Sequence, residues 1–153
     1  MAHATAGDDT QTWRALDRAG AAAERIATEE RPPWPWVFPF GAQKIAYHQL
    51  SCAVRLHRPD LAYAAVDAFS FSDPGHRKQR ALVLLDLASA HVQSHELDEA
   101  LRVATAAVDL VEQTQSERVL SRARQFRRTV PAKAPHGVLR DFDECLRAAN
   151  ARD

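Results

Sequence analysis

The sequence predicts an all-α fold of about seven helices. Only five glycines occur among 153 residues, and the chain is rich in Ala, Leu, Arg and Glu, which favour helices. Apolar residues recur at helical spacing over most of the chain, and no segment alternates as a strand would. With 46% apolar residues, the chain is long enough to form one domain with a core.

The first predicted helix runs from about residue 10 to residue 27. Residues 1–8 are expected to be disordered, and a single domain is expected over residues 9–150. Either Asp9 or Thr10 can cap the helix, because both side chains can accept a hydrogen bond from its first turn. The apolar face of this helix is expected to contain Trp13, Leu16, Gly20, Ala23 and Ala27.

A proline-rich segment, "ERPPWPWVFPF", ends the first helix. Its four prolines exclude helical structure, because proline lacks a backbone N–H donor. We predict a connector over residues 31–41 whose rings fill the seam between the first two long helices. The alternative is an aromatic strip that faces a partner, since an extended chain would place all four rings on one side. The rings belong to Trp34, Trp36, Phe38 and Phe40.

Helical patterning resumes near residue 42 and continues almost to the last residue. Pro59 suits the first turn of one helix and Asp60 suits its N-terminal dipole, while Ser116 can cap a later helix. Six further helices are expected. The first covers about residues 43–56, and the second runs from Pro59 to before Ser70. The other four cover about residues 77–94, 97–113, 116–129 and 138–150.

Two helix pairs resemble each other at an offset of thirty-eight residues. The stretches "LHRPDLAYAAVDAF" and "SHELDEALRVATAAV" share a short turn, an aspartate, and a small residue two positions later. These pairs are Asp60 with Ala62, and Asp98 with Ala100. A period in this range predicts an α-solenoid of antiparallel helix hairpins.

The second of these units resembles a tetratricopeptide repeat. In "KQRALVLLDLASAHVQSHELDEALRVATAAVDL", Ala88, Ala100 and Ala107 occupy small-residue positions of the repeat, and Leu87 occupies the leucine position. His91 stands where the repeat usually has an aromatic residue. Ala104 stands at a second aromatic position, and the closing proline is missing.

Nearly the whole chain, from about Thr10 to Leu146, resembles the C-terminal repeat region of actinobacterial helix-turn-helix transcriptional regulators. The resemblance rests on "RPPWPWVFPF", "CAVRLHRPDLA", "KQRALVLLDLASA" and "SERVLSRARQFRR" in this order. The DNA-binding domain of these regulators has no counterpart before Thr10, so DNA binding is not implied. The resemblance implies a tetratricopeptide-like solenoid with a regulatory or sensory role in the cytoplasm.

No cluster of reactive residues predicts catalysis. His91 and His95 have the i, i+4 spacing of two metal ligands, but a third ligand is missing and packing roles are expected. His48 and Cys52 share that spacing and are also expected to pack. Cys52 and Cys145 are expected to be reduced thiols. Because no phosphate-binding loop or catalytic triad is recognisable, we expect no enzyme, no metal and no cofactor.

Twenty basic residues balance twenty acidic residues, so no net charge draws the chain to nucleic acid or to an anionic membrane. The most apolar window, "ALVLLDLASA", is interrupted by Asp86 and is too short to span a bilayer. The first residues lack the pattern of a secretory signal. We therefore expect a cytoplasmic protein with no nucleic-acid or membrane partner.

A concave groove is the predicted binding surface. The segment "ERVLSRARQFRR" places Val119, Ala123, Phe126 and Val130 on a buried stripe and its arginines outside it. These arginines either pair with Glu112, Asp141 or Asp143 on a solvated face, or hold an acidic peptide or a chain-terminal carboxylate. The candidate groove residues are Lys44, Tyr47, Ser51, Arg55, Leu85, Ser89, Gln93, Arg124 and Arg128.

These observations predict a non-catalytic interaction module that binds a protein or peptide, with a regulatory role. The alternative is the effector-sensing C-terminal half of a transcriptional regulator without its DNA-binding domain. Since the first helix lacks a partner helix, self-association through its open apolar side is also expected.

Overall fold

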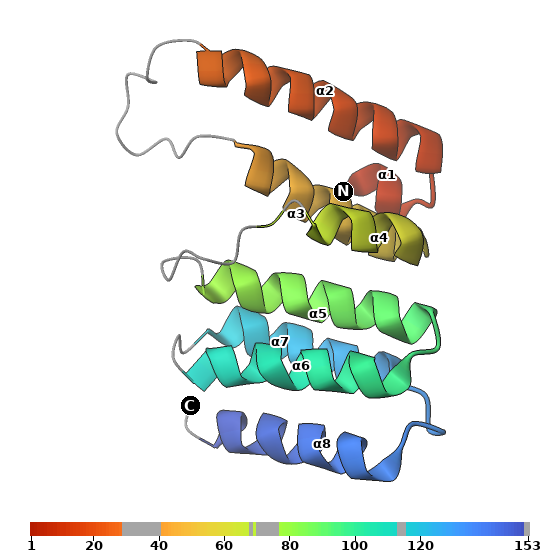
Figure 1. The fold of residues 1–153 in the computed structure, drawn as a ribbon, viewed down its shortest axis with the longest axis vertical. Helices are drawn as coiled ribbons and strands as arrows, with labels where there is room; N and C mark the ends of the chain where they lie inside the picture. The colour runs from red at the N-terminus through yellow and green to blue at the C-terminus, as the bar shows by residue number, and fades with distance from the viewer. Residues whose placement is uncertain (29–40, 68, 70–76, 113–115, 152–153) are drawn as a thin grey trace. The chain divides into compact units, whose positions relative to one another are not determined.

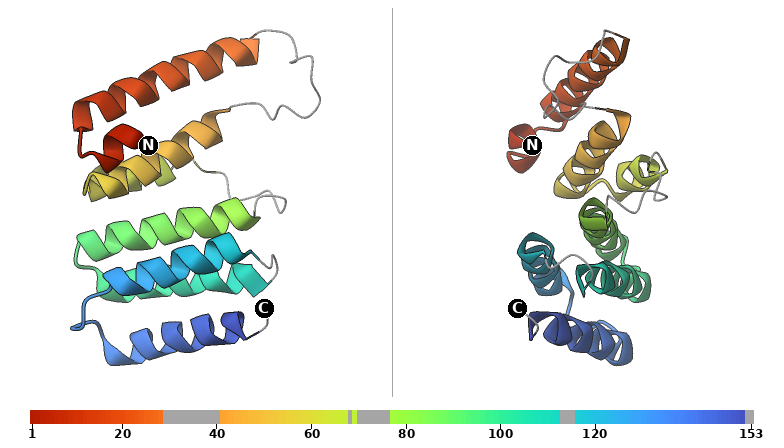
Figure 2. Two further views of the ribbon diagram at one scale, coloured as in Figure 1. Left: turned by 180° about the vertical axis from the view of Figure 1, so that it is seen from behind. Right: turned by 90° about the vertical axis from the view of Figure 1, so that its left-hand side faces the viewer.

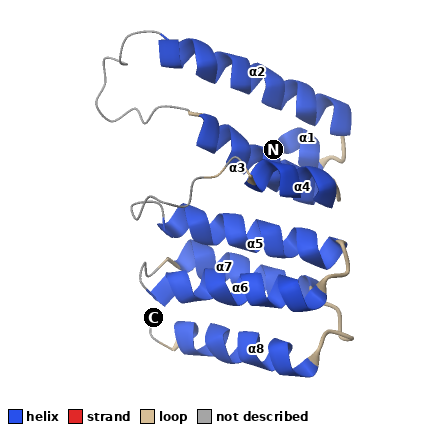
Figure 3. Cartoon of the chain, in the orientation of Figure 1, coloured by secondary structure: helices blue, strands red, loops and turns tan. Residues whose placement is uncertain are grey.

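The computed structural model describes residues 1–28, 41–67, 69, 77–112 and 116–151. These residues form eight α-helices and contain no strand (Figure 3), which confirms the predicted all-α class. None of these helices is both long enough and apolar enough to cross a membrane. The chain divides into two compact units, Met1–Ser70 and Phe71–Asp153, where the sequence predicted a single domain.

Unit 1 contains α1 (Ala2–Thr5), α2 (Asp9–Thr28), α3 (Ala42–Arg55) and α4 (Pro59–Val66). Helix α3 packs against α2 and against α4, and the two neighbours lie on different sides of it (Figure 1). The short helix α1 packs against both α2 and α3. Pro59 occupies the first turn of α4, as the sequence predicted.

The first eight residues differ from the expectation of disorder. Ala4 of α1 is only 2% exposed and packs with Leu16 of α2 and Cys52 of α3. This burial is a tertiary contact, so the short polar sequence of residues 1–8 did not reveal it. The contact also covers part of the α2 surface that was expected to be open.

The cap of α2 is Asp8 rather than Asp9 or Thr10. The Oδ1 atom of Asp8 accepts a hydrogen bond from the backbone N–H of Gln11 (3.0 Å), as an N-cap side chain does. The hydroxyl of Thr12 donates to the backbone oxygen of Asp8 (2.6 Å). Asp9 is therefore the first helical residue, and its carboxylate is available for contacts outside the helix.

Unit 2 contains α5 (Arg77–Gln93), α6 (Leu97–Glu112), α7 (Glu117–Thr129) and α8 (His136–Asn150). Helix α5 packs against α6, α7 packs against α5 and α6, and α8 packs against α6 and α7. The right-hand view of Figure 2 shows these four helices nearly end-on. The rings of Phe126 and Phe142 meet edge to face in the core, with centroids 5.7 Å apart.

The buried stripe predicted for α7 is confirmed, because all four of its residues are buried: Val119, Ala123, Phe126 and Val130. On α5, Leu85 was predicted to line the groove, but it is fully buried. Leu84 and Leu87 are half-buried and also pack against the core. The middle of α5 is apolar on all sides, so periodicity could not select the face that packs.

The predicted thirty-eight-residue offset recurs in the backbone of two turns. His57 (φ 55°) and His95 (φ 63°) both adopt the left-handed conformation after α3 and α5. Each turn has the paired hydrogen bonds of a Schellman motif, which ends a helix by satisfying its last carbonyl groups. The bonds join His57 N to Val54 O (3.2 Å), Arg58 N to Ala53 O (2.9 Å), His95 N to Val92 O (3.1 Å) and Glu96 N to His91 O (2.9 Å).

The proline-rich connector, except for Gly41, lies outside the described residues. The aromatic strip of Trp34, Trp36, Phe38 and Phe40 lies outside them as well.

Candidate functional site

The predicted groove residues of unit 1 lie on α3, but not all of them face solvent. Lys44 and Arg55 are exposed and Tyr47 is half-buried. Ser51 is only 3% exposed, so its side chain belongs to the packing of the unit and does not line a binding surface. The Nη1 atom of Arg55 lies 3.5 Å from the hydroxyl of Thr5, which links α3 to α1.

The groove residues of unit 2 also take part in packing. Leu85 is in the core cluster, and the hydroxyl of Ser89 donates to its backbone oxygen (2.9 Å). Gln93 is half-buried and Arg128 is exposed. Arg124 binds Glu117 (2.8 Å) and donates to the side-chain oxygen of Asn150 (3.1 Å from Nε), so it joins α7 to α8.

Two further arginines of α7 form ion pairs with other helices. Arg127 binds Asp143 of α8 (2.6 Å), one of the partners predicted for this helix, and this hydrogen bond raises the pKa of Arg127. Arg122 binds Asp86 of α5, which is only 2% exposed. The second pair was not predicted. Its signal in the sequence is the single carboxylate inside the apolar window of α5, since a buried charge needs a partner.

The histidines and cysteines that the sequence singled out at the end of α5 and on α3 and α8 take part in turns and packing. His91 lies 2.6 Å from Glu96 across the turn after α5, and His95 is the left-handed residue of that turn. Among the residues that the structure describes, no three His, Cys, Asp or Glu side chains are grouped to hold a metal ion. Cys52 is buried with its sulfur 3.6 Å from that of Met1, and Cys145 donates to Asp109 (3.3 Å).

Unit 1 contains an open cleft of about 500 Å³ that the sequence analysis did not predict. Helices α2, α3 and α4 all contribute to its walls. The lining residues are Asp9 and Trp13 from α2, Gln49 from α3, and Arg58, Leu61, Ala64 and Ala65 from the start and body of α4.

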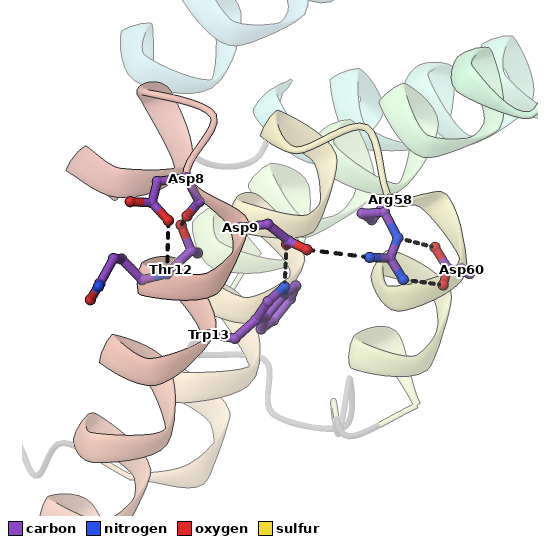
Figure 4. Close-up of polar contacts among 7 residues, drawn as sticks. Asp8, Asp9, Thr12, Trp13, Arg58 and Asp60 are labelled. Carbon is purple, nitrogen blue, oxygen red and sulfur yellow. Dashed lines mark hydrogen bonds and ion pairs between the residues drawn. The ribbon is translucent and has the colours of Figure 1, made fainter.

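A chain of polar contacts, here called the rim, joins three of the lining residues, Asp9, Trp13 and Arg58, to the neighbouring Asp60 (Figure 4). The carboxylate of Asp9 accepts a hydrogen bond from the indole Nε1 of Trp13 (2.5 Å) and lies 3.5 Å from Nη1 of Arg58. Arg58 in turn donates from Nε and Nη2 to the two carboxylate oxygens of Asp60, at 3.2 and 3.1 Å. The rim therefore holds the indole and the guanidinium in fixed positions.

The electrostatics of the rim follow from this bidentate pair. The hydrogen bond with Arg58 lowers the pKa of Asp60, and the same bond raises the pKa of Arg58. Asp9 and Asp60 also lie in the first turns of α2 and α4, where a helix dipole stabilises negative charge. Two carboxylates thus face one guanidinium at this rim.

Sequence reasoning treated Trp13 as part of an apolar stripe and Asp9 as a cap. The available signal was their i, i+4 spacing, which places a carboxylate and an indole on the same side of a helix. Arg58 could not be assigned to them from the sequence, because it approaches from another helix pair.

Comparisons with protein-family models, with curated proteins and with solved structures found no match to this chain.

Proposed function

We propose that this chain is a helical-repeat interaction module that binds a protein or peptide partner and has a regulatory role. The observation that carries the proposal is the repeated turn. The same two hydrogen bonds and the same left-handed histidine recur thirty-eight residues apart, and each turn is followed by a helix with Asp and Ala at matching positions. Repetition of one turn within a chain is typical of repeat proteins, which present extended binding surfaces.

The packing of unit 2 supports the tetratricopeptide-like arrangement. Helix α7 packs on α5, and α8 packs on α6, so that first helices contact first helices and second helices contact second helices. This pairing is expected when antiparallel hairpins stack into a solenoid. Ala88, Ala100 and Ala107, at the small-residue positions of the repeat, are all fully buried. That burial suits the close approach of α5 and α6.

The binding surface in this proposal differs from the predicted groove. Ser51 and Leu85 are no longer candidate binding residues, because both are buried. Arg124 is already bound by Glu117 and Asn150. The cleft of unit 1 replaces them as the principal candidate. The proposed setting is the cytoplasm, which suits a protein whose two cysteines are both thiols.

A second candidate function is effector sensing within a transcriptional regulator. The size of the cleft favours it, because about 500 Å³ falls in the range of small-molecule pockets, and an indole lines one wall.

Affinity capture tests the main proposal. The full chain is immobilised beside its Ala64→Phe variant, which fills the cleft from an exposed position, and beside Ala148→Phe, an exposed position on α8. We expect a partner protein to be retained by the wild type and by Ala148→Phe and to be lost with Ala64→Phe. Isothermal titration with that purified partner then gives the affinities. Equal retention by all three chains, or retention of no protein, contradicts the proposal.

A further inference from the structure

We infer that the cleft of unit 1 binds a protein segment that presents an apolar side chain next to a lysine or arginine. The inference rests on the proposed interaction function and specifies the chemistry of the partner. It differs from the acidic partner that the sequence suggested, because the two carboxylates of Asp9 and Asp60 outnumber the one guanidinium of Arg58 at this site.

The apolar part of the ligand is argued from the walls of the cleft. Trp13 and Leu61 are half-buried, Ala64 is exposed and Ala65 is buried. Two adjacent alanines leave room for another side chain to approach the backbone of α4, while the indole and the leucine supply contact area. A cleft of about 500 Å³ accommodates one or two side chains of a bound segment.

The basic part of the ligand is argued from the donors and acceptors at the rim. Arg58 uses Nε and Nη2 to bind Asp60, and its Nη1 faces Asp9. An incoming anion would have to displace Asp60 from the guanidinium. The carboxylates can accept more than these bonds, since each oxygen has two lone pairs and the side chains of Asp9 and Asp60 are 49% and 61% exposed. An added cation is therefore favoured over an added anion.

The indole of Trp13 adds a second attraction for a cation. Its Nε1–H is held by Asp9, which fixes the orientation of the ring before a ligand arrives. A lysine or arginine beside the ring face gains a cation–π contact, and tryptophan is the best aromatic residue for it. Fixing the ring in advance also lowers the entropy cost of binding.

Nuclear magnetic resonance of the full chain with two matched peptides tests the inference. The probes are the acetylated, amidated hexapeptides GLRLRG and GLELEG, which differ only in the charged residues. The indole signal of Trp13 is assigned by its absence in Trp13→Phe. We expect GLRLRG to shift this signal saturably and GLELEG to leave it in place.

Three variants sharpen the test. Asp9→Asn keeps an acceptor for the indole but removes the charge, and should weaken GLRLRG binding roughly three- to fivefold. The control Asp17→Asn, an exposed position on the same helix, should leave the affinity unchanged. Ala64→Phe should abolish the shift without changing the melting temperature.

Each contrary result has a distinct meaning. Equal shifts of the Trp13 signal by both peptides, or by neither, overturn the inference. A response to GLELEG at the α3 amides near Lys44 and Arg55, with no shift of the Trp13 signal by GLRLRG, overturns it while leaving the proposed interaction function standing. A Trp13 signal that moves with protein concentration alone identifies a second copy of the chain as the occupant, which also overturns it.

Discussion

Each unit contains an arginine–aspartate pair, and the two pairs differ in exposure. In unit 2, Asp86 is 2% exposed and its partner Arg122 is 27% exposed. In unit 1, the side chains of Arg58 and Asp60 are 43% and 61% exposed. The same chemistry thus fixes one helix against another in unit 2 and remains accessible at a cleft in unit 1. The first pair contributes to helix packing, and the second pair belongs to the surface for which we propose a recognition role.

The apolar contacts differ in the same direction. Unit 2 packs the fully buried Phe142 against Phe126 within a cluster to which all four of its helices contribute. Unit 1 attaches α1 through Ala4, Leu16 and Cys52, with Trp13 and Leu56 half-buried beside them. Ala4 and Cys52, which attach α1, are smaller than Phe142, so they bury less area and contribute less to stability.

The largest expected effect comes from removing a ring of unit 2. Phe142→Ala should lower the free energy of unfolding by about 3–5 kcal/mol, because it deletes a fully buried side chain and its edge-to-face contact. Urea denaturation measures the loss, and amide hydrogen exchange should show it in α5–α8. Leu16→Ala in unit 1 is the comparison, and a larger loss for it would break the contrast between the units.

The two ion pairs provide the next test. Asp86→Asn should lower the free energy of unfolding by about 2 kcal/mol, because it leaves the guanidinium of Arg122 without its buried carboxylate. Asp60→Asn should leave the melting temperature unchanged, since solvent and salt already screen that pair. Thermal melts of both variants give the answer, and equal effects would show that exposure does not separate the two pairs.

The turns around His57 and His95 can be compared directly by substitution, with a smaller expected effect on stability. His57→Gly and His95→Gly should each raise the free energy of unfolding by about 0.5–1 kcal/mol, because glycine adopts the left-handed conformation without a steric penalty. Denaturation midpoints should move upward by similar amounts. A gain at one turn and a loss at the other would show that only one histidine makes a stabilising side-chain contact.

The smallest effect is a pH dependence confined to unit 1. Burial lowers the pKa of His48 below its usual 6.5, and the positive charges of the chain amino terminus and Lys44 lower it further. The unfolded chain therefore binds a proton more readily than the folded chain, so stability should fall as the pH drops below about 6.5. Urea midpoints at pH 7.5 and pH 5.5 should show a smaller loss for His48→Gln than for the wild type. An equal loss would assign the pH dependence to other groups.

The sequence by itself determined seven of the eight helices that the structure describes, and several of the turns between them. Proline in the first turn of α4 and the matching turns around His57 and His95 follow from local patterns. Helix α7 begins after Ser116, as predicted, but the Ser116 side chain makes no capping hydrogen bond. Local patterns suffice there because each helical hydrogen bond joins residues four apart, and turn chemistry depends on a few neighbouring residues.

Only the tertiary structure decided which face of each helix packs against its neighbours and which face remains accessible. It buried Leu85 and Ser51, paired Asp86 with Arg122, ordered α1 through Ala4, and opened the cleft beside Trp13. These outcomes depend on residues far apart in the chain, and the faces of α5 were similar enough in polarity to pack either way. The periodicity of one helix contains no information about the charge or shape of the helix that it meets.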